Sequence, residues 1–307
     1  MAEKCLIAVM GPTASGKSEL AVQLAEYFDT EIISVDARQV FKETNKATAK
    51  PTADQLSRAK HHFISSHSIF EEYTAARFGN EARSVLHDLL QRKNYAIAAG
   101  GSTLYYQAFL DGLDDMPPST QQALEQVQNL YEAHGLAGLQ KVLYEADPEY
   151  MKSADIQNHR RLMRALEVYY SSGKPFSSYF NKKQAAAHIY RTVKIGLDLP
   201  REILYARINK RCEEMLADGL LEEVQQLHPY KHLRTMQTVG YNEFFSYLDG
   251  ELALEQAIEK FKQHTRNYAK RQLTWFRRDT EIKWFSPEDM DEIIAFVSQN
   301  SQGGARG

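Results

Sequence analysis

The segment Cys5-Leu-Ile-Ala-Val-Met-Gly-Pro-Thr-Ala-Ser-Gly-Lys-Ser18 joins an apolar run to a glycine-rich loop. Cys5 to Met10 is a continuous apolar run, typical of a buried parallel strand. The loop matches the pattern G-x-x-x-x-G-K-[ST], in which backbone N–H groups point at phosphate oxygens and the lysine adds a charge. It predicts a diphosphate or triphosphate site, with the Ser18 hydroxyl as a Mg²⁺ ligand, made of Gly11, Pro12, Thr13, Ala14, Ser15, Gly16, Lys17 and Ser18. A glycine-rich turn with a solvated lysine is the less favoured alternative.

Apolar strands and amphipathic helices alternate after this loop. One helical pattern leads into the strand Glu31 to Val35, and another leads into the strand Tyr95 to Ala99. Strands that alternate with helices form parallel sheets with right-handed crossovers. The alternation therefore predicts an α/β fold whose core is a P-loop NTPase-like parallel sheet.

A segment rich in Pro, Gly and Asp, Asp111 to Thr120, interrupts the alternation. Every periodic stretch from there to about Tyr179 is helical. Val193 to Leu199 has the pattern of a returning strand, and long helices follow to about Arg278. We therefore expect residues 1–113 and 188–298 to form the core, residues 114–187 to form a helical insertion, and residues 299–307 to be a disordered tail.

Composition limits the class of protein. The chain has 307 residues and a formal net charge of −3, so a nucleic-acid partner would have to be held by local basic patches. Its two cysteines, Cys5 and Cys212, exclude a disulfide framework or a four-cysteine zinc module and suit a reducing compartment. The apolar run at the N-terminus is too short to span a membrane. We expect a cytoplasmic protein that is not bound to a membrane.

Asp36 directly follows the second strand. The carboxyl ends of parallel strands form the ligand-binding edge of such a sheet, where a carboxylate can orient Mg²⁺ or accept a proton from an attacking group. An aspartate that caps the turn is the structural alternative. The third strand ends in Gly100-Gly101-Ser102, so no second carboxylate competes for the role. This spacing alone fits small-molecule kinases equally well.

An arginine stands in the apolar stripe of a later helix. Leu204, Ile208 and Met215 share one face between residues 201 and 227, and Arg211 falls on that face with Arg207 one turn earlier. Two arginines four residues apart repel each other, and one that faces the core needs an anion. A shared phosphate would satisfy both. Pairing with carboxylates such as Glu214 or Asp218 is the alternative.

Two helices carry basic faces. The first contains Arg160 and Arg164 opposite an apolar face that includes Leu162. In the second, about residues 259–278, we expect Phe261, Tyr268 and Trp275 to be buried, and the basic residues are Arg266, Lys270, Arg271, Arg277 and Arg278. One such face is usually solvated surface, but two in a chain of this charge make a polyanion such as RNA an equal alternative. His61, His62 and His67 match no zinc signature, so we do not expect a metal there.

Together these segments resemble the bacterial-type tRNA dimethylallyltransferases. The matching stretches cover most of the chain in the family's order: residues 11–18, Ser34-Val-Asp-Ala-Arg-Gln-Val-Phe41, Thr48-Ala-Lys-Pro-Thr52, Gly100-Gly-Ser-Thr-Leu-Tyr105, Arg160-Arg-Leu-Met-Arg-Ala-Leu-Glu-Val168, Gln237-Thr-Val-Gly-Tyr241 and Ala269-Lys-Arg-Gln-Leu-Thr-Trp275. The resemblance implies transfer of a dimethylallyl group from dimethylallyl diphosphate to N6 of the tRNA adenosine 3′ to the anticodon. It also implies that the helical insertion clasps the anticodon stem-loop.

The resemblance also implies roles for individual residues. Asp36 would accept the N6 proton, Thr13 would lie near the bridging oxygen and Ser102 would contact substrate. Lys17, Arg211 and Mg²⁺ at Ser18 would stabilise the leaving diphosphate, with Arg207 nearby. The expected tRNA contacts are Asp36, Ala37, Arg38, Gln39, Arg160, Arg161, Leu162, Met163, Arg164, Gln237, Thr238, Val239, Gly240 and Tyr241, together with Arg266, Lys270 and Arg271 on the last basic helix. We expect a monomer.

The chain departs from the family pattern at several positions. Ala37 and Phe41 replace the usual Ser and Tyr, and Ser18 and Ser102 stand where Thr is common. The segment Asn45 to Thr48 lacks the usual Gly, which leaves the shape of that loop open. Two other classes of function are alternatives to the transferase. One is a small-molecule or nucleotide kinase with the insertion as a lid, and the other is a non-catalytic RNA-binding P-loop protein.

Overall fold

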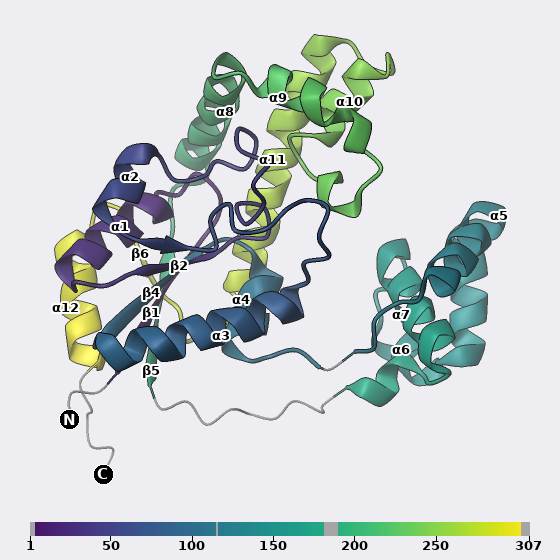
Figure 1. Ribbon diagram of the computed structural model, residues 1–307, viewed down its shortest axis with the longest axis horizontal. Coiled ribbons are helices and arrows are strands. Elements are labelled where there is room, and N and C mark those ends of the chain that lie inside the picture. The colour runs from purple at the N-terminus through teal and green to yellow at the C-terminus, as the bar shows by residue number, and fades with distance from the viewer. Residues whose placement is uncertain (1–3, 115, 181–189, 302–307) are drawn as a thin grey trace. The chain divides into compact units, whose positions relative to one another are not determined.

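A six-stranded parallel sheet forms the centre of the fold (Figure 1). The computed structural model describes residues 4–114, 116–180 and 190–301. The strand order is β3-β2-β4-β1-β5-β6, which confirms the parallel α/β core. The strands are β1 (Cys5–Met10), β2 (Ile32–Val35), β3 (His61–His62), β4 (Tyr95–Gly100), β5 (Arg191–Leu197) and β6 (Lys283–Phe285). Strands β3 and β6 were not predicted, because two or three residues are too few to show a period.

The register of the central strands gathers the predicted site residues at one edge. Met10 pairs with Gly100, and Gly100 pairs with Val35 on the other side. Strands β1, β4 and β2 therefore end at the same level, so the phosphate loop, Ser102 and Asp36 follow neighbouring strand ends. A side chain at Gly100 would collide with the Val35 carbonyl oxygen, since an added Cβ would lie 2.0 Å from it.

Helices cover both faces of the sheet. Cys5, Ile7 and Val9 of β1 share a core with Leu24 and Val297, which lie on two helices of one face. On the other face the Tyr106 hydroxyl donates to the Val9 and Ala98 carbonyls at 2.8 and 2.9 Å. Alternate residues of β1 are thus buried on opposite faces, which explains its unbroken apolar run. The helices of the first face are α1 (Lys17–Tyr27) and α12 (Met290–Ser301), and those of the second are α3 (Ala75–Arg92) and α4 (Thr103–Leu110).

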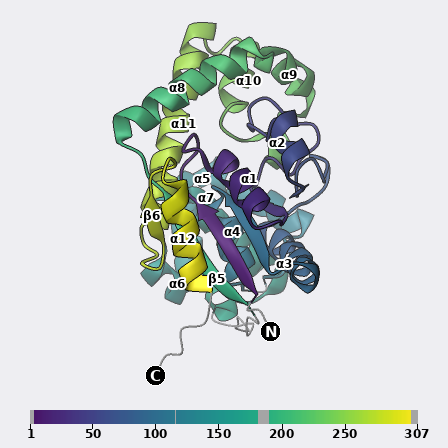
Figure 2. The same cartoon turned by 90° about the vertical axis from the view of Figure 1, so that its left-hand side faces the viewer.

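A second group of helices lies beyond the carboxyl ends of the strands (Figures 1 and 2). It consists of α8 (Arg201–Ala217), α9 (Leu220–Leu227), α10 (Asn242–Leu248) and α11 (Leu254–Phe276), with α2 (Ala53–Arg58) nearer the sheet. The fully buried aromatics of α11 are Phe261 and Phe276, whereas Tyr268 and Trp275 are only half-buried. The expected buried face is therefore rotated slightly, and the polar residue Gln272 occupies part of it.

The chain divides into two compact units, residues 1–111 with 187–307 and residues 112–186. The second unit is entirely helical in its described residues, with α5 (Gln121–Ala146), α6 (Pro148–Ser153), α7 (His159–Ser172) and the 3₁₀ turn η1 (Phe176–Tyr179). Its own core is formed by Val127, Leu139, Leu143, Leu162, Ala165 and Leu166. Asp147 caps α6 through Tyr150 N–H at 3.0 Å and also accepts from Ser177, which fastens η1 to the bundle.

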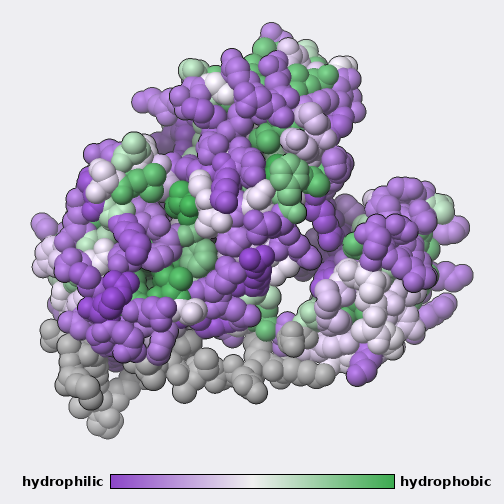
Figure 3. Space-filling view, viewed as in Figure 1, coloured by the Kyte–Doolittle hydropathy of each residue, from purple (hydrophilic) through white to green (hydrophobic). Residues whose placement is uncertain are grey.

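Residues 299–301, expected to belong to a disordered tail, are the last residues of helix α12. Helix α12 continues to Ser301, which is buried and whose hydroxyl lies 3.1 Å from the hydroxyl of the half-buried Tyr95 at the start of β4. Residues 302–307 lie outside the described part of the chain. In the described helices, no segment is both long enough and apolar enough to cross a bilayer. Hydrophilic residues predominate on the face of the first unit seen in Figure 3.

Candidate active site

The phosphate loop has the backbone of an anion cradle. Gly11, Ala14 and Gly16 have φ values of 148°, 64° and 96°, so the chain turns sharply between β1 and α1. In the described residues, no atom accepts a hydrogen bond from the N–H of Ala14, Gly16, Lys17 or Ser18. The Ser15 hydroxyl is buried and likewise has no partner there. Donors without acceptors at a helix N-terminus form a binding site for phosphate groups.

Two cations stand beside this cradle. Lys17 Nζ folds back to donate to the Pro12 carbonyl at 2.5 Å. Desolvation, together with the nearby Arg211 guanidinium, lowers the pKa of Lys17 to about 7, and the Asp36 carboxylate offsets this only in part. Burial also lowers the pKa of Arg211, which donates to the Ala49 carbonyl at 3.4 Å. This pair of poorly solvated cations is an environment that favours a bound anion.

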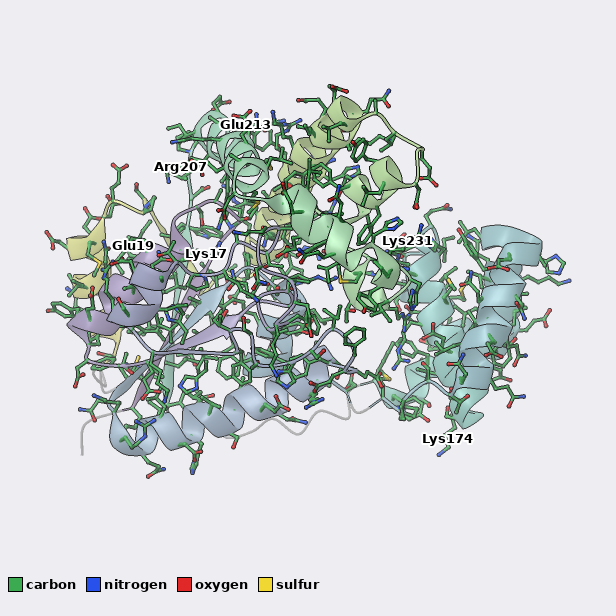
Figure 4. All side chains as sticks on the ribbon, turned by 45° about the horizontal axis from the view of Figure 1, so that its top comes forward. Lys17, Glu19, Lys174, Arg207, Glu213 and Lys231 are labelled. Carbon is green, nitrogen blue, oxygen red and sulfur yellow. The ribbon has the colours of Figure 1, made fainter. Side chains whose placement is uncertain are left out.

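Neither carboxylate offered as an alternative partner forms an ion pair with Arg211 in the described residues, although the Glu214 charge acts to raise the pKa of Arg211. Asp218 pairs with Lys46 at 2.7 Å, and Glu214 pairs with Lys210 at 3.6 Å. Figure 4 shows Lys17 at the start of α1 and Arg207 on α8. Arg207 is exposed, whereas Arg211, one turn later, is half-buried. Of the two arginines, Arg211 is therefore the one that interacts electrostatically with Lys17 and Asp36.

Asp36 sits in a turn that it stabilises itself. Its Oδ1 accepts from the Arg38 and Gln39 N–H groups at 2.8 and 3.2 Å. Desolvation raises the pKa of the Asp36 carboxyl, while these two hydrogen bonds and the Lys17 charge act against the rise. The capping role considered from the sequence is thus present, and it uses one carboxylate oxygen. A partly buried carboxylate with a raised pKa is suited to accept a proton.

Ser102 ties the Asp36 turn to the end of β4. Its Oγ accepts from the Ala37 N–H at 2.9 Å. A hydrogen bond with Ser102 also acts on the Tyr268 hydroxyl, whose pKa is nevertheless raised to about 12, mainly by burial. The helical spacing predicts only a packing role for Tyr268. Its position beside Ser102 makes it part of the site.

Arg38 lies inside the site rather than on an open surface. Its Nη1 donates to the Thr235 carbonyl at 2.8 Å. Burial lowers the pKa of Arg38, and the groups that act against this include Tyr105, Asp36 and Tyr268. The tyrosines around Arg38 could not be recognised from sequence, because each reads as an ordinary core aromatic.

The residues expected to contact tRNA are in varied surroundings. Arg160, Arg161, Lys270 and Arg271 are exposed. Arg164 instead donates to Ser119 and to the Pro117 carbonyl, and lies 3.6 Å from the buried Glu167. Arg266 donates to Asn209 at 2.6 Å. Leu162 belongs to the core of the second unit, and Met163 beside it is half-buried.

The other expected contacts lie around a loop held by Glu223. This α9 carboxylate accepts from the N–H groups of Asn45 and Lys46 and, at 2.7 Å, from the hydroxyl of the fully buried Tyr241. These contacts fix the segment whose shape the sequence left open. Gln39 supports the same loop by donating to the Ala49 carbonyl at 2.9 Å. In the segment Gln237 to Tyr241, the Gly240 N–H donates to Glu243 at 2.8 Å.

The three histidines considered as metal ligands have other partners. His61 Nδ1 lies 2.8 Å from the Ala59 carbonyl, His62 Nε2 lies 2.7 Å from Glu31, and His67 Nδ1 lies 2.9 Å from the Ser66 hydroxyl. These contacts hold β3 and the loop after it in place.

Gln272 is a buried polar residue that faces the phosphate loop from α11. Its Oε1 accepts from the Thr13 N–H at 2.9 Å, and its Nε2 donates to the Gly101 carbonyl at 2.8 Å. The only signal for it in the sequence is a glutamine in the apolar stripe of a helix, which by itself indicates no particular role.

Comparison with known proteins gives a consistent result. A family model described as IPP transferase matches residues 39–279. The tRNA dimethylallyltransferase of Christiangramia forsetii is 47% identical and aligns over 94% of this chain and 95% of its own. That of Flavobacterium johnsoniae is 43% identical, over 97% of this chain and 98% of its own.

Solved structures share the fold. The full-length tRNA isopentenylpyrophosphate transferase from Bacillus halodurans has a TM-score of 0.71 and 32% identity, covering 97% of this chain and 96% of its own. A eukaryotic dimethylallyltransferase crystallised while acting on tRNA has a TM-score of 0.75 and 29% identity, covering 96% of this chain and 77% of its own.

Proposed function

This chain belongs to the IPP transferase family, and we propose that it transfers a dimethylallyl group from dimethylallyl diphosphate to N6 of the adenosine 3′ to the anticodon in tRNA. Diphosphate is the second product. The observation that carries the proposal is the placing of an anion cradle with two cations, Lys17 and Arg211, beside the proton-accepting carboxylate of Asp36. A prenyl transfer needs both parts within one site.

In the proposed reaction, a bond forms between N6 and C1 of the prenyl group while the bond from C1 to the diphosphate oxygen breaks. N6 is a poor nucleophile because its lone pair is delocalised into the purine. Asp36 accepts the N6 proton, and the leaving diphosphate takes the electron pair. The loop amides, Lys17 and Arg211 stabilise the charge that develops on the diphosphate, with Thr13 near the bridging oxygen and Ser102 at the substrate.

The loop residues also fit a magnesium ion. Mg²⁺ in phosphate sites takes few protein ligands and completes its shell with phosphate oxygens and water. Ser18 offers one hydroxyl at the start of α1, and the described residues contain no cluster of three or more His, Cys, Asp or Glu that would favour another metal. When bound, Mg²⁺ would add positive charge beside the diphosphate.

We assign RNA binding to exposed basic residues on both units, chiefly Arg160 and Arg161 on α7 and Lys270 and Arg271 on α11. Backbone phosphates are bound mostly by such side chains. As part of the same proposal, residues 114–187 form the RNA-binding insertion, and the enzyme acts as a cytoplasmic monomer. The segments Asp36 to Gln39 and Gln237 to Tyr241 would then lie close to the target nucleotide, which must leave its stack to reach Asp36.

The deciding experiment measures transfer of radiolabelled prenyl from dimethylallyl diphosphate to an unmodified anticodon stem-loop with Mg²⁺, beside an ATP hydrolysis assay. Label in the RNA with ATP untouched is the expected result. ATP consumption without labelled RNA would favour the kinase alternative. RNA binding with neither activity would favour a non-catalytic P-loop protein.

A further inference from the structure

We propose that Gln272 is a positioning residue for the transfer reaction, because its amide sets the spacing between the diphosphate loop and the turn that carries Asp36. This inference rests on the proposed function. Gln272 meets the phosphate loop only at the Thr13 N–H, and it has no hydrogen bond to the Asp36 carboxylate in the described residues. It acts through Thr13 on one side and Gly101 on the other.

The bridge is complete and enclosed. Gln272 is only 3% exposed, and both ends of its amide are hydrogen-bonded to backbone: Oε1 to the Thr13 N–H at 2.9 Å and Nε2 to the Gly101 carbonyl at 2.8 Å. The amide oxygen thus has a donor on the phosphate loop, and the amide nitrogen has an acceptor on the loop after β4. A buried amide satisfied in this way holds its neighbours in a single arrangement, since any shift would leave a polar group without a partner.

One of the two loops binds the leaving diphosphate, and the other leads to the turn that carries the proton acceptor. Thr13 is in the loop that binds the diphosphate. Gly101 is joined to Ser102, whose Oγ accepts from the Ala37 N–H at 2.9 Å beside Asp36. The chain of contacts Thr13, Gln272, Gly101, Ser102 and Ala37 therefore connects the leaving group's site to the proton acceptor. Small errors in such spacing slow a reaction more than they weaken binding.

The absence of a side chain at Gly101 is a second indication that the Gln272 amide packs tightly against the end of β4. A Cβ placed at Gly101 would lie 2.2 Å from Gln272 Nε2 and 3.3 Å from the Gly11 carbonyl oxygen. Glycine allows the glutamine amide to approach the end of β4. Gly101→Ala should therefore displace mainly the Gln272 amide, and its Cβ would also lie close to the Gly11 carbonyl of the phosphate loop.

The first test compares Gln272→Met with the parent chain at saturating dimethylallyl diphosphate and stem-loop RNA. Methionine keeps the length and the apolar stem but loses both hydrogen bonds. We expect the single-turnover rate to fall by about 10- to 100-fold, while the dissociation constant for the donor changes less than about threefold. A role limited to stability would lower the melting temperature and leave the rate of the folded fraction unchanged, which would overturn the proposal.

The second test uses Gln272→Glu. A protonated carboxyl can replace the amide, since it donates to Gly101 and accepts from Thr13. Once ionised it loses that donor and places a negative charge against the Gly101 carbonyl. The ratio of parent rate to Gln272→Glu rate should rise several-fold from pH 6 to pH 8.5, and the same ratio for Gln272→Met should stay flat. A ratio that does not depend on pH for Gln272→Glu would overturn the proposal.

The third test is a double-mutant cycle. Gly101→Ala alone should slow transfer about as much as Gln272→Met. In a Gln272→Ala background its effect should be much smaller, because the colliding amide is gone and only the 3.3 Å contact with the Gly11 carbonyl oxygen remains. Full additivity would contradict the inferred coupling.

Hydrogen exchange separates this inference from the proposed function. The Thr13 amide should exchange faster in Gln272→Met than in the parent chain, and this readout needs no turnover. If the parent chain transfers no prenyl group, the proposed function fails even where the exchange result is as expected. Unchanged exchange at Thr13 in an active enzyme would overturn the Gln272 bridge alone.

Discussion

At the scale of single residues, Asp36 combines a structural and a chemical task. Its Oδ1 holds the turn through the Arg38 and Gln39 amides. An asparagine keeps an acceptor at that position but cannot take up a proton. We therefore expect Asp36→Asn to slow single-turnover transfer by about 10²- to 10⁴-fold while the fold and RNA binding are retained. An unchanged rate would remove Asp36 from the role of base.

Asp36 should also determine the pH below which the transfer rate falls. Burial raises the pKa of the Asp36 carboxyl, so the group is protonated, and unable to act as a base, at a higher pH than an ordinary aspartate. The rate should fall as the pH is lowered through that pKa. The matched Asp36→Asn variant should lack this fall in rate, which a comparison of the two pH profiles will show.

The pKa of Lys17 leads to a prediction about how the affinity for inorganic diphosphate depends on pH. Its pKa of about 7 in the free protein means that the ammonium loses its proton as the pH rises through 7. A bound anion favours the charged form and raises this pKa, so binding takes up a proton. Affinity should therefore fall with rising pH above about 7, at most about tenfold per pH unit.

Calorimetry in buffers of different ionisation enthalpy measures this proton uptake. Lys17→Met serves as the control, because it leaves only the ligand's own protonation to vary with pH. Equal proton uptake by Lys17→Met and the parent chain would show that Lys17 is already charged in the free loop.

At the scale of elements, α7 presents two kinds of arginine. Arg160 and Arg161 are exposed, so Arg160→Gln with Arg161→Gln should weaken stem-loop binding and reduce its salt dependence by roughly one to two units of slope. Arg164 lies beside the buried Glu167 and holds the segment before α5. Arg164→Ala should instead lower the thermal stability of the second unit.

Filter binding over a series of salt concentrations, with thermal melts of the same variants, distinguishes the two effects. An unaltered salt slope in the double variant would make Arg160 and Arg161 plain solvated surface. A melting temperature unchanged by Arg164→Ala would contradict its structural role.

At the scale of the whole molecule, each of the two units has a hydrophobic core among its described residues. Leu24 is fully buried in the core beside the sheet, and Leu139 is fully buried in the core of the helical unit. Truncation of either leucine to alanine leaves a cavity that costs about 2–5 kcal/mol. Leu139→Ala should destabilise residues 112–186 alone and leave diphosphate binding intact.

Hydrogen exchange followed by mass spectrometry will show which peptides lose protection. Leu24→Ala is the matched control, because it should expose the sheet core and weaken diphosphate binding. Loss of protection in both units from Leu139→Ala would show that they unfold as one body.

Local sequence patterns were sufficient for the strands that carry the site and for the phosphate loop. β1 and the loop after it contain their information within fourteen consecutive residues, Cys5 to Ser18, since the apolar run and the glycines act over short distances. The end of β2 placed Asp36 at the ligand-binding edge for the same reason. Strands β3 and β6 could not be predicted, because two or three residues are too few to show an alternating pattern.

The partners of each side chain depended on how the chain folds back on itself. The Gln272 amide meets Thr13 across 259 positions of sequence, and the Arg38 guanidinium reaches the Thr235 carbonyl across 197. In α11, a one-residue difference in the buried face puts Phe276 rather than Trp275 in the core and leaves Gln272 beside the phosphate loop. Periodicity identifies a helix and its apolar stripe, but packing against neighbouring elements selects which residue of that stripe faces the site.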